Sequence, residues 1–264
     1  MLKRFITGLV SAALLFAFMF APSWALRWAL LLVAVWGVTE MLDAFQIVGH
    51  QPIRWSSYIA LALVIPAHLT IGNRAPLPIL TLILMLTTFN IAIRKQPSWI
   101  DAAASLYAAF TVALPILMLM EIDMSTTPPG RWMVFASFVI PLLGDISALY
   151  VGTTFGRHKL NPMLSPSKTW EGAAAGLIGS MTGAMLLGGI GIRFAPLPPL
   201  MHWAALGLIG GIAGQLGDFS ASLMKRWCGV KDFGVVFPGH GGIMDRFDSV
   251  LFCVYVIYIY ILII

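Results

Sequence analysis

The sequence contains few charged residues. Only 10% of its 264 residues are Asp, Glu, Lys or Arg, whereas a soluble globular domain carries about 25%. It also has only two cysteines, Cys228 and Cys253, which have no metal-binding spacing and provide no disulfide framework. These absences argue against a soluble globular domain and against a disulfide-stabilised fold. We expect the two cysteines to be packing residues.

Hydrophobic residues, by contrast, make up 59% of the chain, and the mean hydropathy is +0.89. A helix needs about 20 apolar residues to cross the hydrocarbon core of a bilayer. We therefore predict an all-α polytopic membrane protein. Apolar stretches between charged or Pro/Gly-rich breaks predict nine spans, at about 5–22, 24–39, 56–72, 77–93, 102–120, 132–155, 172–192, 200–224 and 249–264. Arg27 shortens the second of them.

The first stretch has an alternative interpretation as a cleavable signal peptide. Lys3 and Arg4 precede an apolar run that ends in the small-residue sequence 23–25. The run is longer than the usual apolar region of a signal peptide, however, and another span follows at once. We therefore expect the first stretch to remain as a span.

The basic residues predict the orientation, because Lys and Arg accumulate in cytoplasmic loops. With a cytoplasmic N-terminus and nine spans, twelve of the sixteen lie on the cytoplasmic side: Lys3, Arg4, Arg54, Arg94, Lys95, Arg157, Lys159, Lys168, Lys225, Arg226, Lys231 and Arg246. The C-terminus then lies outside, and we expect a bacterial inner membrane. The net charge of +5 reflects this asymmetry and nearby anionic headgroups, and does not indicate nucleic-acid binding.

The acidic residues concentrate in the last four predicted spans. Five acids lie near span ends in the first half: Glu40, Asp43, Asp101, Glu121 and Asp123. The other six lie at or toward the predicted cytoplasmic face: Asp145, Glu171, Asp218, Asp232, Asp245 and Asp248. Asp145 is about halfway along its helix, so it requires a partner or a polar cavity. A helix–helix hydrogen bond would explain Asp145 alone, but it does not explain six acids on one side.

The eighth span and the loop after it carry the most specific spacing. Asp218, Ser222 and Lys225 stand at i, i+4 and i+7, on one stripe of a helix, which a snorkelling helix end would also produce. Glycines follow at 239, 241 and 242 and allow backbone amides to approach a phosphate. Asp245 and Asp248 can share a helical face and offer the oxygen ligands that Mg²⁺ prefers. Residues 238–242 alone could be a turn. Together, these features predict a site for nucleotide phosphate and metal.

The run from Ser222 to Asp248, called here the signature segment, resembles the signature of phosphatidate cytidylyltransferases, also called CDP-diacylglycerol synthases. It reads Ser-x-x-Lys-Arg, four residues, Lys-Asp, then Pro-Gly-His-Gly-Gly-x-x-Asp-Arg-x-Asp. A second similar stretch extends from Asp145 to Gly172, where Ser167 replaces the usual Lys of Ser-Pro-Lys-Lys-Thr-x-Glu-Gly. The resemblance covers roughly residues 140–250.

This resemblance implies specific roles. It implies a homodimer and a catalytic Mg²⁺ on Asp218 and Asp245, to which Asp145 and Asp248 are candidate additions, and a second, monovalent cation is left open. The candidate catalytic residues are Asp218, Lys225, Asp245 and Asp248. The candidate substrate-binding residues are Ser165, Lys168, Thr169, Glu171, Ser222, Arg226, Lys231, Asp232, Gly239, His240, Gly241, Gly242 and Arg246. We expect residues 1–130 to be a scaffold with dimer contacts and residues 131–264 to carry the site for CTP and phosphatidic acid.

The expected reaction is attack by a phosphatidate oxygen on the α-phosphorus of CTP, which releases pyrophosphate. The substrate is the nucleophile, so positioning and charge neutralisation are the main requirements. Two alternatives remain open: a polyprenol kinase, dolichol kinase or CDP-archaeol synthase, and an ion-coupled transporter with acids near mid-membrane. Glycine pairs at four-residue spacing, 172/176, 179/183, 207/211 and 210/214, predict close packing of the seventh and eighth spans.

Overall fold

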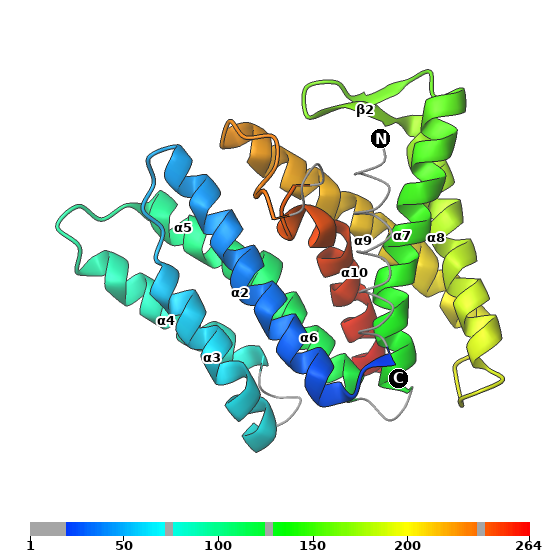
Figure 1. Cartoon of the computed structure of the whole chain (residues 1–264), viewed down its shortest axis with the longest axis horizontal. Helices are drawn as coiled ribbons and strands as arrows, with labels where there is room; N and C mark the ends of the chain where they lie inside the picture. Colours follow the sequence, from blue (N-terminus) through cyan, green and yellow to red (C-terminus); the bar gives the residue numbers. More distant parts are fainter. Residues whose placement is uncertain (1–19, 72–75, 125–128, 237–240) are drawn as a thin grey trace. The chain divides into compact units, whose positions relative to one another are not determined.

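The computed structural model describes residues 20–71, 76–124, 129–236 and 241–264 (Figure 1). The helices are α2 (Ser23–Ile47), α3 (Arg54–Ile71), α4 (Pro76–Ala92), α5 (Trp99–Ala108), the π-helix η2 (Ala109–Ala113), α6 (Leu114–Asp123), α7 (Gly130–Phe155), α8 (Trp170–Gly191), α9 (Leu200–Trp227) and α10 (Met244–Ile263). Two short strands, β1 (Lys159–Asn161) and β2 (Ser165–Thr169), pair antiparallel between α7 and α8. The predicted span at 5–22, with its signal-peptide alternative, lies almost entirely outside the described residues.

The helices confirm that the protein is an all-α polytopic membrane protein. Within the described ranges, six helices are long and apolar enough to cross a bilayer: Ser23–Ile47, Trp99–Asp123, Gly130–Phe155, Trp170–Gly191, Leu200–Trp227 and Met244–Ile263. Leu77–Ala92 is apolar but shorter. The predicted count of nine spans is therefore not confirmed, although a helix covers each of the predicted stretches from the second onward.

The second predicted span is longer than the sequence suggested. We expected it to end near residue 39, but α2 continues to Ile47 and includes Glu40 and Asp43. The helix tolerates both acids because each carboxylate has partners. Asp43 pairs with Arg54, and Glu40 is buried and accepts two backbone hydrogen bonds.

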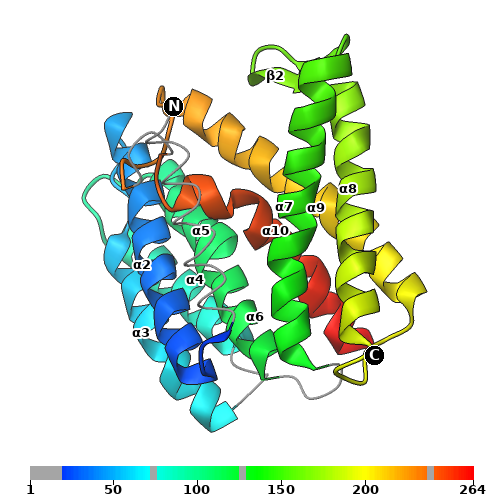
Figure 2. The same cartoon turned by 45° about the vertical axis from the view of Figure 1, so that its right-hand side comes forward.

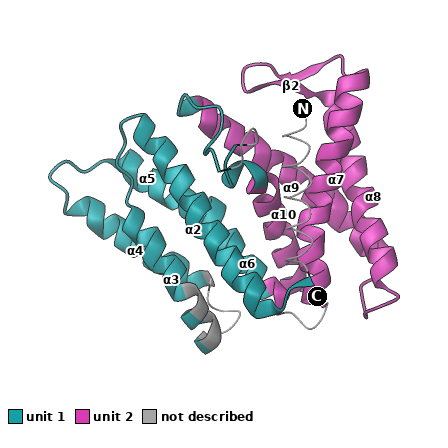
Figure 3. Cartoon of the chain, viewed as in Figure 1, with its two compact units in different colours: residues 1–121, 227–246 teal, residues 122–226, 247–264 magenta. Residues whose placement is uncertain are grey.

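The chain divides into two compact units (Figure 3). Unit 1 comprises Met1–Glu121 together with Trp227–Arg246. In it, α2 contacts α3 and α5, while α4 contacts α3 and α5. The π-helix η2 precedes Pro115, whose ring nitrogen cannot donate the hydrogen bond expected in a regular helix. Most of the signature segment thus groups with the N-terminal helices, whereas the predicted division at residue 130 stays a prediction.

Unit 2 comprises Ile122–Arg226 together with Phe247–Ile264. In this unit, helices α7 and α8 run side by side, and the β1–β2 hairpin connects the end of α7 to the start of α8 (Figures 1 and 2). Close packing of α8 and α9 is confirmed, because a Cβ on Gly207 would lie 2.5 Å from the Cα of Met181. The glycines of α8 at 172, 176, 179 and 183 instead lie chiefly against α7. The small residues therefore bring three helices close together.

Candidate functional site

Three carboxylates on three different helices form an acidic cluster in unit 2. Asp145 is on α7, Asp218 is on α9 and Asp248 is on α10. The Asp218 carboxylate interacts electrostatically with the carboxylates of Asp145 and Asp248. Asp145 and Asp248 also interact electrostatically with each other. Asp248 is buried, and its Oδ1 accepts the backbone N–H of Ser249 at 2.7 Å. The fold therefore brings together acids that are up to 103 positions apart in the sequence.

Two lysines balance part of this negative charge. The Lys168 ammonium on β2 pairs with the Asp218 carboxylate, and it lies 4.2 Å from the centroid of the Phe219 ring. The Lys168 ammonium also interacts electrostatically with the Asp145 carboxylate, and the Lys225 ammonium interacts in the same way with the Asp248 carboxylate. A group of carboxylates and ammonium groups at one place can bind a ligand that carries both metal ions and phosphates. All five are among the candidate site residues named from the sequence, and their role in the reaction stays a prediction.

The signature residues near the end of α9 have mixed roles. Ser222 lies 3.5 Å from Asp218, one helical turn away, so these two members of the predicted stripe are neighbours on α9. Arg226 instead donates from Nε to the backbone oxygen of Leu164 at 3.3 Å. Arg226 therefore connects α9 to the β1–β2 hairpin within unit 2.

The predicted residues of the hairpin surround the start of α8. Ser165 and Lys168 lie in β2. Thr169 is the N-cap of α8, and its Oγ1 accepts the N–H of Gly172 at 3.1 Å. Glu171, in the first turn of α8, pairs with the Nδ1 of His158 at 2.7 Å. Acidic residues in a first turn also interact favourably with the helix dipole.

The rest of the predicted site lies in unit 1. Asp245 Oδ2 accepts the N–H groups of Phe233 at 2.8 Å and Gly242 at 2.9 Å. Gly241 has a φ of +79°, a backbone conformation that favours glycine. Asp245 therefore orients the backbone around this turn.

The other predicted residues of this segment are partly described. Lys231 and Asp232 are exposed ahead of the turn, and Arg246 is exposed in the first turn of α10. The predicted residues Gly239 and His240 lie outside the described residues. Because the signature segment contributes residues to both units, the predicted pairing of Asp218 with Asp245 on one metal ion stays a prediction.

Sequence analysis missed one functional candidate, Glu40. Its carboxylate accepts the backbone N–H groups of Ile243 at 3.1 Å and Met244 at 2.9 Å, within unit 1. An ionisable residue directly after a long apolar run was the available signal. The contact joins residues more than 200 positions apart, which one sequence alone does not reveal.

Two histidines, His158 and His202, have hydrogen-bond partners within the protein, and both cysteines are buried. His158 pairs with Glu171, and His202 pairs with Tyr260 at 2.8 Å. Cys228 and Cys253 are buried, and burial raises the pKa of the Cys228 thiol. The thiol of Cys228 therefore stays protonated and packs as an apolar group.

The donor chemistry of the acidic cluster suits a hard cation such as Mg²⁺. In the part of the chain that the structure describes, no three acidic, histidine or cysteine side chains converge on one ion position. A Mg²⁺ ion that binds with a nucleotide needs only one or two carboxylates, because phosphate oxygens complete its coordination. Asp218, with Asp145 or Asp248, fits this kind of site.

Comparison with known proteins agrees with the motifs. The model of the cytidylyltransferase family matches residues 2–264. A phosphatidate cytidylyltransferase of Staphylococcus aureus (strain COL) is 36% identical over 167 residues, which are 62% of this chain and 61% of the relative. The phosphatidate cytidylyltransferase of Bacillus subtilis (strain 168) is 34% identical over 171 residues, 64% of this chain and 62% of the relative. The chain thus matches about three-fifths of the length of these curated relatives. From the match over nearly its whole length, the chain belongs to the cytidylyltransferase family.

Proposed function

We propose that this protein transfers CMP from CTP to phosphatidic acid and produces CDP-diacylglycerol and pyrophosphate. The observation that carries the proposal is the cluster of Asp145, Asp218 and Asp248 with Lys168 and Lys225 in unit 2. Membership of the family and the complete signature segment support the same reaction. The names of the relatives supply the lipid substrate.

The proposed chemistry needs no protein nucleophile. A phosphate oxygen of phosphatidic acid attacks the α-phosphorus of CTP, the bond to the β-phosphate bridging oxygen breaks, and pyrophosphate leaves. Both cysteines are buried, which agrees with this direct attack. Lys225 and Lys168 would offset negative charge on the phosphates, and the protein would hold the two substrates in line. The products contain every atom of the two substrates.

We further propose that the site works with Mg²⁺, held by Asp218 with Asp145, Asp248 or Asp245. When bound, the ion would neutralise phosphate charge and lower the repulsion between two anionic substrates. The two lysines would share this task. A carboxylate cluster without a cation repels a nucleoside triphosphate, so cations at the cluster are needed for CTP to bind.

The membrane setting fits an acceptor that is a lipid. A polar site formed by residues of membrane helices can take CTP from water while acyl chains remain in the bilayer. We propose the bacterial inner membrane, with the N-terminus cytoplasmic and the C-terminus outside, because twelve of sixteen basic residues then face the cytoplasm. The homodimer implied by the family resemblance remains part of the proposal.

A panel of lipid acceptors tests the proposed substrate. Purified protein in detergent receives CTP and Mg²⁺ with phosphatidic acid, diacylglycerol or a polyprenol, and pyrophosphate release is measured. We expect release with phosphatidic acid alone. A phosphorylated lipid product formed from diacylglycerol or the polyprenol, with CDP in place of pyrophosphate, would indicate a kinase and contradict the proposed function.

A further inference from the structure

The buried carboxylate of Glu40 lies against the part of the signature segment that begins α10. Glu40 is on α2, and only 5% of its surface is exposed. One carboxylate oxygen accepts the N–H of Ile243 and the other accepts the N–H of Met244. The first N–H groups of a helix have no partner within the helix, so this carboxylate caps α10 from another helix.

The glycines of the segment leave room for this carboxylate. A Cβ on Gly242 would lie 2.3 Å from Oε2 and 2.5 Å from Oε1 of Glu40. A Cβ on Gly234 would lie 2.2 Å from Oε1. Neither glycine has a positive φ, so close approach to Glu40, and not backbone conformation, is the reason that a side chain is unfavourable at both positions.

The other end of the same segment also contacts the N-terminal helices. The Trp227 ring stacks on His50, with centroids 5.5 Å apart and planes at 10°. Phe45 packs against Trp227 edge-on, with centroids 5.7 Å apart. These contacts fall within unit 1, which contains both the N-terminal helices and residues 227–246.

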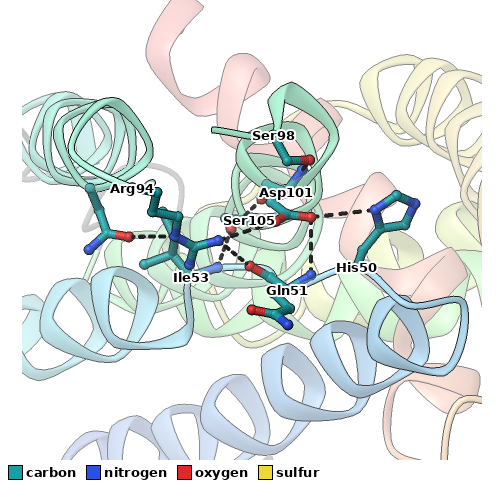
Figure 4. Close-up of polar contacts among 8 residues, drawn as sticks. His50, Gln51, Ile53, Arg94, Ser98, Asp101 and Ser105 are labelled. Atoms are coloured by element: carbon teal, nitrogen blue, oxygen red, sulfur yellow. Dashed lines mark hydrogen bonds and ion pairs between the residues drawn. The ribbon is translucent and has the colours of Figure 1, made fainter. Parts of the chain in front are cut away.

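A polar network around the buried carboxylate of Asp101 contacts His50 (Figure 4). Asp101 lies 3.4 Å from the Nδ1 of His50, and it accepts hydrogen bonds from the Gln51 N–H at 3.0 Å and from Arg94 at 3.1 Å. Ser105, one turn along the helix from Asp101, accepts the N–H of Ile53 at 2.7 Å. Figure 4 shows the His50 ring, the backbone N–H of Gln51 and the Arg94 guanidinium directed toward the Asp101 carboxylate. The buried Asp101 carboxylate therefore contacts the His50 ring, the backbone of Gln51 and the Arg94 side chain together.

We propose that the N-terminal helices position the signature segment, and that Glu40 is the positioning residue on which its Gly241–Asp245 part depends. Glu40 fixes the amides of Ile243 and Met244, and so it fixes the backbone of Gly242 and Asp245, which belong to the proposed CTP site. His50 and Phe45 hold Trp227 at the other end. The identity of the ligand, CTP, rests on the proposed function. The anchoring of the segment by Glu40 does not depend on it.

Hydrogen–deuterium exchange of the full-length protein in detergent tests the anchoring without any assay of activity. Glu40→Gln replaces one acceptor oxygen with an NH₂ group and removes the charge. We expect peptides that contain residues 241–246 to exchange at least about tenfold faster, as expected when a hydrogen bond to a charged acceptor is lost. Asp43→Asn is the matched control, since Asp43 is on the same helix and pairs with Arg54. Unchanged exchange in Glu40→Gln would overturn the anchor, whatever the protein's activity.

Steady-state kinetics tests what the anchor does. If Glu40 positions the CTP site, Glu40→Gln should lower kcat/KM for CTP about tenfold or more and leave KM for phosphatidic acid within about twofold. All rates are normalised to protein that elutes as one folded species in size-exclusion chromatography. Faster exchange with an unchanged kcat/KM for CTP would show a purely structural contact and contradict the positioning role.

A double-mutant cycle tests the contact between Glu40 and Gly242 from the glycine side. Gly242→Ala in the wild-type background forces the new methyl group against the Glu40 carboxylate and should displace it. In a Glu40→Ala background the same change no longer meets the carboxylate atoms that lie nearest to it, so its additional effect on kcat/KM for CTP should be smaller by about fivefold or more. Independent, multiplicative effects of the two changes would contradict the proposal. If wild-type protein shows no reaction with CTP at all, the proposed function fails while the exchange result still decides the anchor.

Discussion

Thr169 is a predicted substrate contact that the structure places at the N-cap of α8, and a pair of substitutions separates the two roles. Its side chain is 4% exposed, and Oγ1 accepts the N–H of Gly172. Thr169→Val keeps the shape but removes the acceptor, which costs about 1 to 2 kcal/mol from the lost cap and the unpaired amide. For a protein of this size, a loss of about 1 kcal/mol in the free energy of unfolding lowers the unfolding temperature by about 2 to 4 °C. We therefore expect the unfolding temperature to fall by about 2 to 8 °C.

Thr169→Ser is the control, because it keeps the oxygen and removes only a methyl group, worth about 0.8 kcal/mol. Its unfolding temperature should fall by about 3 °C or less, and its KM for CTP should stay within about twofold. Both variants are measured by thermal unfolding in detergent and by initial rates at varied CTP. If Thr169→Val is as stable as the wild type and raises KM for CTP, Thr169 contacts the substrate and the capping account is wrong.

Two further predictions concern the metal and the topology. Asp218→Asn or Asp245→Asn should remove nearly all activity while the folded yield stays unchanged, because each variant loses a proposed oxygen ligand of Mg²⁺. Near-wild-type turnover at saturating Mg²⁺ would show that the ligand assignment is wrong. Single cysteines are introduced at Ser167, at Val235 or after Ile264, in a background without Cys228 and Cys253. The first two should react with a membrane-impermeant reagent only from the cytoplasmic side, and the third only from outside. Labelling of both groups from one side would overturn the proposed orientation.

The apolar pattern predicted the helices well because each span is a local feature of about 20 residues. The structure has a helix at every predicted stretch that falls within the described ranges. The boundaries were less accurate where a charge was satisfied by a distant partner. The helix α2 continues past Glu40 because the N–H groups of Ile243 and Met244 bind its carboxylate, and no pattern within α2 shows that.

The candidate site was predictable to the extent that its residues are close together in the chain. The Asp218–Ser222 stripe follows from helical periodicity alone. The capping role of Thr169 and the fixing of Gly242 by Asp245 required coordinates, since a hydroxyl or carboxylate in a motif serves a ligand or the backbone equally well. The grouping of residues 227–246 with the N-terminal helices was also beyond sequence reasoning, because it depends on long-range packing.

CTP labelled at the α-phosphorus distinguishes direct transfer of CMP to the lipid from the alternative reactions. Purified protein is incubated with the labelled CTP, Mg²⁺ and phosphatidic acid, and lipid, nucleotide and protein fractions are separated. The account predicts that the label enters the lipid as CDP-diacylglycerol, with one pyrophosphate released for each molecule formed, and that protein incubated without lipid stays unlabelled. Label on the protein, exchange of pyrophosphate into CTP without lipid, or release of labelled CDP with a phosphorylated lipid would contradict the direct transfer of CMP to phosphatidic acid.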